Sequence, residues 1–218
     1  MTTNPERSEL PERGIGPEVG VEEELSSGQF FLEMVKVFIL AALIIIPVRV
    51  FLFQPFFVQG SSMMPNFENG EYLVVNEFGF KQTEIGASGS PFFTVSPFYV
   101  LPRQEPIVFR SPQNPDLYLI KRVIGLPGET VRIERSKVFI VNEAHPDGYE
   151  LDEKAYLSSS VITTDMKPIT LGADQYLVLG DNRMNSLDSR VFGPVSKELI
   201  VGRVLLRAWP IPRAEWYK

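Results

Sequence analysis

The chain of 218 residues has no cysteine and only one histidine. Without cysteine it cannot form disulfide bonds, use a thiol in catalysis or bind zinc through sulfur. With one histidine it cannot build a metal site from several imidazoles. That histidine, His145, lies in the hydrophilic, turn-like stretch 142–148, where we expect a surface loop. The net charge of −6 argues against nucleic acid as a partner.

The first 29 residues lack the regular spacing of apolar side chains that is typical of helices and strands. This segment holds seven glutamates and two arginines, with scattered proline and glycine. Such a composition offers too little apolar surface to bury and too much charge of one sign to fold. We therefore interpret residues 1–29 as a disordered acidic tail.

One long apolar run is present, at residues 34–53. Its 20 residues are about the number that a helix needs to cross a bilayer, and Lys36 and Arg49 near its ends can reach the interface. A cleaved signal peptide would start with a basic segment, whereas this run follows an acidic one. We predict a transmembrane anchor over residues 30–55, with a buried core helix as the alternative. The balance of Lys and Arg on its two sides is too even to give an orientation.

No long helical period follows residue 55. Instead, short runs of β-branched and aromatic residues recur between Gly, Pro and Asn. We predict a mostly β domain over residues 56–218, a coiled antiparallel β-sheet behind a single N-terminal transmembrane helix. The candidate strands are Tyr72–Val75, Pro106–Phe109, Leu117–Ile124, Thr130–Ile133, Lys137–Val141, Tyr176–Leu179 and Leu199–Arg207.

Residues 81–104 form an unusual segment, in which Gly, Ser and Pro alternate with aromatic residues. We expect a long loop, and a loop of this length and aromatic content is either functional or packed on something. Two interpretations remain open. The loop enters the membrane interface, where aromatic side chains are favoured, or it packs over the core.

Ser62 is the first candidate for catalysis. It lies in the segment Gly-Ser-Ser-Met-Met-Pro at residues 60–65, a few residues past the apolar run. Gly60 leaves the backbone room for the close approach of a substrate. The amide of Ser62 itself can donate to a developing oxyanion. A Ser/Gly turn after a membrane helix is the structural alternative.

A serine nucleophile needs a base, and histidine is nearly excluded here. Lys121 lies within the run 117–124, whose two strand faces are both largely apolar. Burial lowers the pKa of a lysine, which allows it to act as a base, as in the Ser-Lys variants of serine hydrolases. An edge strand that exposes Lys121, or an ion pair, is the alternative.

A dense polar loop, Gly-Asp-Asn-Arg-Met-Asn-Ser-Leu-Asp-Ser-Arg at residues 180–190, is the third element. Short polar side chains bond nearby backbone groups and hold such a loop in one conformation. Asp188 and Arg190 are suited to pair within it. A lysine base needs an orienting acceptor, and Ser186 can supply one. A purely structural loop is the alternative.

These three segments, in this order and behind an apolar anchor, closely resemble the motifs of the bacterial type I signal peptidases. The likeness rests on residues 62–65, on Lys-Arg-Val-Ile-Gly-Leu-Pro-Gly at 121–128 and on the loop 180–190, and it covers roughly residues 50–209. Each motif alone is modest, but the three together are highly specific.

The resemblance implies a role for each site residue. Ser62 is then the nucleophile, Lys121 the general base, and Ser186 the hydroxyl that positions the lysine, while Asp188 and Arg190 support the loop. Gly60 stands where some relatives carry a hydroxyl residue that binds the oxyanion, so the oxyanion site is expected from the backbone at Gly60 and Ser62. No metal or cofactor is implied.

The resemblance also implies the substrate and the membrane topology. An extended chain would add as a strand beside residues 54–61 and 117–121. Small residues of an Ala-x-Ala-like cleavage site would enter shallow apolar pockets, lined by Phe56, Val58, Leu73, Leu119 and Ile120. The partners are then signal-peptide-bearing preproteins and the lipid bilayer. The chain would cross the plasma (inner) membrane once, with its N-terminus in the cytoplasm and its β domain outside.

Three alternatives stay open on the sequence. One is another Ser-Lys protease, either a conjugation-type peptidase or a self-cleaving repressor, although a repressor needs a basic DNA-binding segment and residues 1–29 are acidic. The second is an organellar processing peptidase, which a basic transit peptide would favour. The third is a non-enzymatic, membrane-anchored β module that would keep its function without Ser62 and Lys121.

Overall fold

The computed structural model describes residues 27–217 except 52, 81–82, 88–89 and 96–97. The chain divides into two compact units, Met1–Leu43 and Ile44–Lys218. The predicted tail, residues 1–29, lies almost wholly outside the described residues. Strands and turns dominate the second unit, and an N-terminal apolar helix precedes them, so the predicted mostly β class is confirmed.

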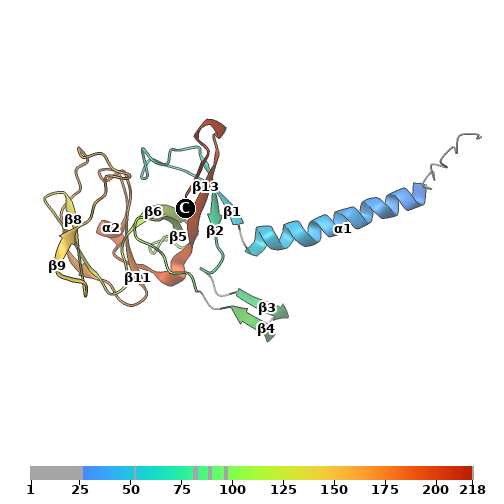
Figure 1. Ribbon diagram of the computed structural model, residues 1–218, viewed down its shortest axis with the longest axis horizontal. Helices are drawn as coiled ribbons and strands as arrows, with labels where there is room; N and C mark the ends of the chain where they lie inside the picture. Colours follow the sequence, from blue (N-terminus) through green and yellow to red (C-terminus); the bar gives the residue numbers. More distant parts are fainter. Residues whose placement is uncertain (1–26, 52, 81–82, 88–89, 96–97, 218) are drawn as a thin grey trace, which may run out of the picture. The chain divides into compact units, whose positions relative to one another are not determined.

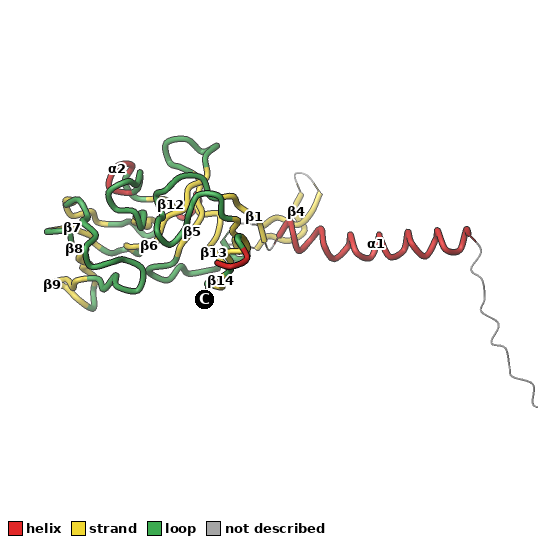
Figure 2. The backbone as a smooth tube through the Cα atoms, turned by 90° about the horizontal axis from the view of Figure 1, so that it is seen from above, coloured by secondary structure: helices red, strands yellow, loops and turns green. Residues whose placement is uncertain are grey.

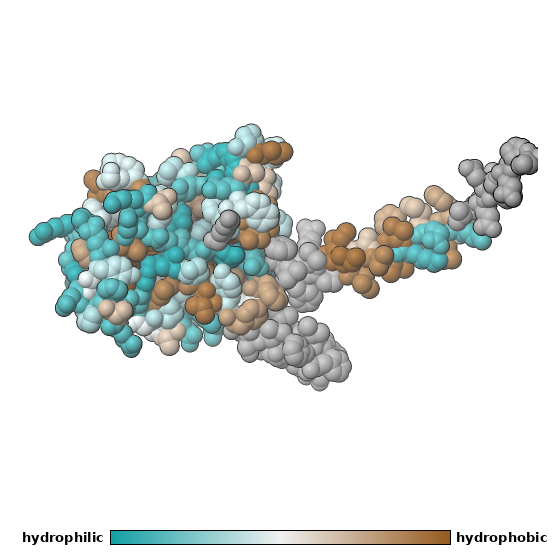
Figure 3. Space-filling model, viewed as in Figure 1, coloured by the Kyte–Doolittle hydropathy of each residue, from teal (hydrophilic) through white to brown (hydrophobic). Residues whose placement is uncertain are grey.

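Helix α1 runs from Ser27 to Phe51. At ~1.5 Å per residue such a helix is about 37 Å long, which exceeds the ~30 Å thickness of a hydrocarbon core. Its window Gly28–Ile45 has a mean hydropathy of 2.0, and none of that window is buried. Figure 3 shows apolar side chains over much of its surface. The helix therefore has the length and composition of a membrane span. It ends at Phe51 and the first strand begins at Phe53, three residues before the predicted start of the β domain.

Eight antiparallel strands form the larger sheet, in the order β1–β2–β13–β5–β6–β11–β12 with β14 paired to β13. The prediction of a strand is confirmed at every segment proposed for this sheet. The strands are β1 (Phe53–Phe57), β2 (Tyr72–Asn76), β5 (Pro106–Arg110), β6 (Tyr118–Gly125), β11 (Gln175–Leu179), β12 (Val195–Ser196), β13 (Ile200–Trp209) and β14 (Glu215–Trp216). A short helix α2 (Ser189–Phe192) and two 3-10 turns, Lys197–Leu199 and Ile211–Arg213, connect them.

A second sheet has the order β10–β7–β8–β9. Its strands are β7 (Thr130–Glu134), β8 (Lys137–Asn142), β9 (His145–Glu150) and β10 (Met166–Thr170). Figures 1 and 2 show β8 and β9 at one end of the second unit, far from β1. His145 is exposed as expected, but it begins strand β9, so the prediction of a loop was wrong: Asn142 closes a turn and pairs with His145 across it.

The segment predicted as a long loop, residues 81–104, also contains regular structure. Strands β3 (Thr83–Ala87) and β4 (Ser90–Val95) pair as an antiparallel hairpin. After the hairpin, Leu101 is buried in a core cluster and Tyr99 packs against it, while Phe98 remains exposed. The core-packing interpretation therefore holds for the end of the segment.

The apolar core of the second unit lies in three clusters. One cluster is shared by β5, β6 and β11, a second by the smaller sheet and the neighbouring ends of β6 and β11, and a third by β2, β13 and the β1–β2 loop. Val58 and Met63 belong to the third cluster and are 6% and 1% exposed. These two residues bracket the loop that contains Ser62, so the core fixes that loop on both sides.

Candidate active site

Ser62 lies in the loop between β1 and β2, where the backbone turns sharply. Gly60 has a φ of +95°, in the left-handed region that favours glycine, although a Cβ at this position would touch nothing within 4 Å. The requirement for glycine is therefore conformational rather than steric. The Gly60 amide donates to Oδ1 of Asn69 at 3.0 Å, so it is already engaged.

Lys121 lies on β6, opposite Ile107 of β5. Its side chain reaches Ser62: Nζ lies 2.7 Å from Ser62 Oγ and 2.8 Å from the carbonyl oxygen of Ile120. The residue is only 2% exposed. The prediction that places Ser62 beside a buried Lys121 agrees with this geometry, and an exposed edge lysine does not.

Burial lowers the pKa of Lys121 from 10.5 to about 8, because the charged amine loses its hydration. The nearby carboxylates of Asp188 and Asp181 act in the opposite direction and limit the decrease. At pH 7 about one molecule in ten then carries a neutral amine, compared with about one in 2,500 for a free lysine. The amine is therefore available as a base.

The polar loop 180–190 is hydrogen-bonded to the segment around Ser62. The Asn182 amide donates to the Ser62 carbonyl at 3.0 Å, and the Asn182 and Asn185 side chains donate to Ser61 at 3.1 and 2.9 Å. Gly180 lies where the two segments meet. A Cβ there would be 2.1 Å from Ser186 Oγ and 2.5 Å from the Ser62 carbonyl oxygen, so only glycine permits this approach.

Asp188 and Arg190 pair within the loop, as the sequence suggests. Arg190 donates to both carboxylate oxygens of Asp188 at 2.8 Å, and the Gly180 amide donates to the same carboxylate at 3.0 Å. Burial alone raises the pKa of the Asp188 carboxyl, but these hydrogen bonds and the charge of Arg190 outweigh it and lower the pKa. Asp188 also caps helix α2. The loop is thus locked around a carboxylate that stays ionised.

The Ser186 hydroxyl is buried and makes no hydrogen bond of ordinary geometry with the described residues. It lies close enough to Asp188 to help lower the pKa of that carboxyl. Lys121 donates to Ser62 and Ile120, and a bond to Ser186 is not among its interactions with the described residues. Ser186 therefore lies close to both the Asp188 carboxylate and the Ser62 carbonyl.

Sequence reasoning assigned no role to an ion pair next to Lys121. Arg122 donates to both oxygens of Asp181 at 2.8 and 2.6 Å, and both residues are buried. Asp181 lies in the third motif and Arg122 in the second, so the bond joins the two motifs directly. Their positions within the motifs are the one sequence signal that pointed to them.

A cleft of ≈ 280 Å³ opens onto Ser62 and Lys121. Its walls contain every residue that the resemblance assigned to the substrate pockets, namely Phe56, Val58, Leu73, Leu119 and Ile120. Strand β11 pairs with β6 only from Arg122 onward. Residues 118–121 of β6 therefore have one edge that no described strand covers.

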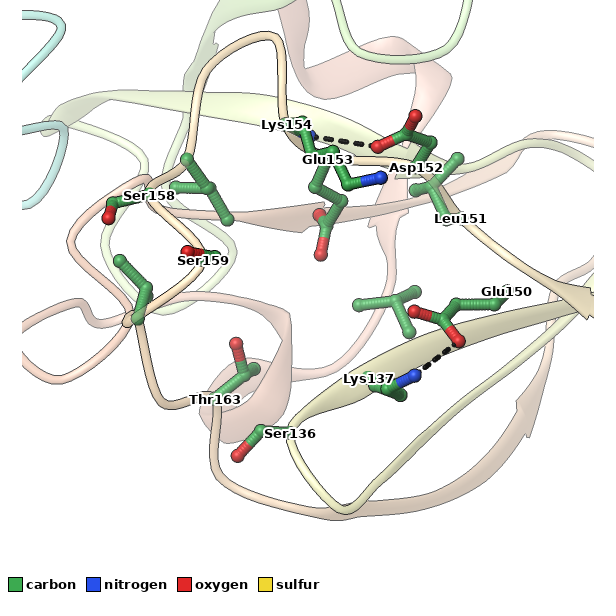
Figure 4. Close-up of a pocket in the computed structure, with 13 residues that line it drawn as sticks. Ser136, Lys137, Glu150, Leu151, Asp152, Glu153, Lys154, Ser158, Ser159 and Thr163 are labelled. Atoms are coloured by element: carbon green, nitrogen blue, oxygen red, sulfur yellow. Dashed lines mark hydrogen bonds and ion pairs between the residues drawn. The ribbon is translucent and has the colours of Figure 1, made fainter.

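Two other cavities contain neither Ser62 nor Lys121. One, of ≈ 450 Å³, lies against β8 and the segment 150–163 (Figure 4). The other, of ≈ 520 Å³, lies between β10 and the loop 183–191. Among the described residues there is no cluster of histidine, cysteine or carboxylate side chains suited to a metal ion.

Comparison with known proteins agrees with the motifs. Residues 31–209 match the family "Signal peptidase, peptidase S26". Signal peptidase I P of Bacillus subtilis subsp. natto is 34% identical over 84% of this chain and 91% of its own length. Signal peptidase IB of Staphylococcus aureus is 31% identical over 82% of this chain and 90% of its own length. A solved signal peptidase I from Enterococcus faecalis is 33% identical, with a TM-score of 0.40 over 48% of this chain and 97% of that one. The chain therefore belongs to the signal peptidase I family of serine endopeptidases.

Proposed function

We propose that this member of the family is membrane-anchored, uses a Ser62–Lys121 dyad, and removes signal peptides by cutting after small residues. The observation that carries the proposal is the 2.7 Å contact between Ser62 Oγ and the amine of a lysine that is 2% exposed. A charged lysine gains little from such burial, whereas a catalytic base needs it.

The reaction follows from the two groups. Neutral Lys121 removes the Ser62 proton as Oγ attacks the carbonyl carbon of the scissile peptide bond. The tetrahedral intermediate collapses as the C–N bond breaks, and the ammonium of Lys121 gives its proton to the leaving amine. The amine, neutral again, then takes a proton from a water molecule that hydrolyses the acyl-enzyme, and Ser62 recovers its own proton.

The oxyanion needs donors that point at the carbonyl oxygen of the substrate. Of the two backbone amides that the sequence suggested, the one at Gly60 is bonded to Asn69. The amide of Ser62 is therefore the donor that we assign to the oxyanion. Gly60 then serves the site by its left-handed backbone conformation, which turns the chain toward the cleft.

We expect the substrate to bind as an extended strand. The uncovered edge of residues 118–121 and the outer strand β1 both border the cleft that contains the dyad. Main-chain hydrogen bonds to these edges would hold any sequence, and side-chain pockets would select among them. The largely apolar walls of the cleft suit the small apolar side chains of signal-peptide cleavage sites.

A membrane anchor would bring the enzyme to its substrates. Signal peptides are themselves apolar segments, and an enzyme that is anchored in the same bilayer meets them at the membrane surface. We propose that α1 spans the plasma membrane with the N-terminus in the cytoplasm and the β domain outside. The hydropathy and length of α1 support the span, and the family relationship supports its direction.

We assign Ser186 to positioning. Its hydroxyl is buried close to the Ser62 carbonyl oxygen, in the loop that is hydrogen-bonded to the Ser62 segment, and makes no hydrogen bond of ordinary geometry with the described residues. A hydroxyl in that place orients the lone pair of the neutral amine toward Ser62, as a third group orients the base in a triad.

The proposal is tested with the detergent-solubilised full chain and a secretory preprotein. The wild type should release a mature product whose new N-terminus follows a small residue, and Ser62→Ala should leave the preprotein intact while remaining folded. Normal cleavage by Ser62→Ala would contradict the proposed nucleophile. A product that is cut elsewhere would contradict the proposed specificity.

A further inference from the structure

A turn at residues 153–157, here called the bracing turn, contacts all three segments that build the dyad. It lies outside the three sequence motifs and outside both sheets. The carbonyl of Glu153 accepts from the amides of Tyr156 and Leu157 at 3.2 and 2.9 Å, which closes the turn.

The first contact reaches the loop that contains Ser186. Glu153 accepts from both terminal nitrogens of Arg183, at 2.5 and 3.2 Å, and the Arg183 side chain is 0% exposed. Burial alone lowers the pKa of Arg183, but the hydrogen bond and charge of Glu153 outweigh it and raise the pKa. Arg183 in turn donates to the carbonyl of Gly180 at 3.0 Å, at the point where the loop meets Ser62.

The second contact reaches the strand of Lys121. The ring of Tyr156 lies 4.1 Å from the guanidinium carbon of Arg122, which is the residue after Lys121. An arginine over an aromatic face is attracted by the ring, more strongly where both are desolvated. Arg122 is buried and bonded to Asp181, so the ring completes the fixed surroundings of its side chain.

The third contact reaches the loop of Ser62. Asn66, four residues past the nucleophile, donates its side-chain amide to the carbonyl of Tyr156 at 2.8 Å. The same amide donates to Asp181 at 2.8 Å. The bracing turn and Asp181 thus hold the Ser62 loop from two directions.

We propose that Glu153 and Tyr156 are positioning residues for the proposed Ser62–Lys121 reaction: the bracing turn holds the nucleophile loop, the lysine strand and the Ser186 loop in one fixed arrangement. The inference rests on the proposed function. A displacement of about 1 Å in such an arrangement costs up to about 10²-fold in rate, so the bracing turn should affect kcat more than KM.

Glu150, on the neighbouring strand β9, supplies a matched control. Glu153 and Glu150 both line the cavity of Figure 4, but Glu150 pairs with the exposed Lys137 at 2.7 Å and not with Arg183. A Glu→Gln change at either position removes the same charge from the same cavity. The Glu153 change alone removes the carboxylate partner of a buried arginine.

The pH profile separates positioning from general stability. The charges of Asp181 and Asp188, which are paired with Arg122 and Arg190, favour the protonated form of Lys121. Asp181 also interacts with the charge of Arg183. When Glu153 is neutral, the charge of Arg183 offsets more of the Asp181 charge, so Asp181 favours the protonated amine of Lys121 less and the pKa of that amine falls. The apparent pKa in kcat/KM should therefore move to lower pH.

The experiment compares Glu153→Gln and Glu150→Gln in preprotein cleavage by the full chain. We expect Glu153→Gln to lower kcat by about tenfold, with KM within about twofold and a lower apparent pKa, and Glu150→Gln to match the wild type. Equal kcat, KM and pH profile in the two variants would overturn the inference. Cleavage by the wild type and its loss in Ser62→Ala would leave the proposed function standing in that case.

If Glu153→Gln does not fold, two variants of Tyr156 test the positioning role of the bracing turn. Tyr156→Phe keeps the ring over Arg122 and the main-chain bond to Asn66 and loses the hydroxyl bond to Glu153 at 2.6 Å, whereas Tyr156→Leu loses the ring as well. We expect Tyr156→Phe to keep kcat within about threefold and Tyr156→Leu to fall about tenfold. The same kcat in both tyrosine variants would overturn the bracing role.

Discussion

Replacement of Lys121 by methionine should stabilise the folded protein at neutral pH, although it removes the proposed base. Methionine has nearly the length of lysine and no charge, so it fills the same buried space without the cost of desolvating an ammonium. Burial lowers the pKa of Lys121 from 10.5 to about 8. Because the folded chain holds this proton less tightly than the unfolded chain, the protonated lysine destabilises the fold.

The sign and size of the effect follow from proton linkage. Between pH 8 and 10.5 the unfolded chain binds more protons at Lys121 than the folded chain, so wild-type stability rises with pH through this window. The penalty is fully present below pH 8 and absent above pH 10.5. At about 1.4 kcal/mol per pKa unit it amounts to about 3 kcal/mol at neutral pH. The hydrogen bonds that methionine cannot make to Ser62 and Ile120 offset about 1 kcal/mol each.

Urea unfolding of the full chain in detergent measures the difference. The two tryptophans, Trp209 and Trp216, lie at the end of β13 and on β14, so their fluorescence reports on the catalytic sheet. The difference in free energy of unfolding between Lys121→Met and wild type should shrink by about 2 kcal/mol between pH 7 and 10. Lys137→Met, which removes an exposed lysine paired with Glu150, is the control and should show no such trend. A difference that stays constant from pH 7 to 10 would refute a lowered pKa for Lys121.

Three further outcomes are expected. Ser186→Ala should lower kcat by about 10²-fold, as expected for the positioning of a general base, and an unchanged kcat would leave the loop a structural role only. Asp188→Asn should shift the apparent pKa in kcat/KM to lower pH, because the Asp188 charge favours the protonated Lys121; a shift to higher pH would contradict this. Protease added to intact spheroplasts should digest the C-terminal domain and spare the N-terminal tail, whereas protection of that domain would reverse the proposed topology.

The strands that could be predicted are those with apolar or alternating sequences. The run 117–124 and the segment 199–207 were placed within one residue or two, because their β-branched side chains fill the core. Strand β9 was missed, since Pro146, Asp147 and Gly148 give it the composition of a turn and it lies at the edge of the smaller sheet. Strand β1 was missed because its apolar sequence continues that of the helix.

Site residues that lie within short sequence motifs could be predicted, and those defined only by contacts distant in sequence could not. Ser62, Lys121 and Asp188 stand in compact motifs, and the structure brings all three motifs together. Glu153 and Tyr156 had no such signal. Their partners, Arg183 and Arg122, are far away in sequence, and a glutamate and a tyrosine in a polar segment are ordinary surface residues until the fold shows what they contact.

The most direct test of the Ser62–Lys121 mechanism is the pH dependence of kcat/KM for preprotein cleavage, measured for the wild type and for Lys121→Arg. Arginine keeps the charge and approximate length of lysine but does not lose its proton in a protein. The wild-type value should rise with pH through an apparent pKa near 8, the pKa of the buried amine in the free enzyme, and Lys121→Arg should be folded and nearly inactive. A wild-type profile that is flat from pH 6 to 10, or substantial activity in Lys121→Arg, would contradict a neutral lysine as the base.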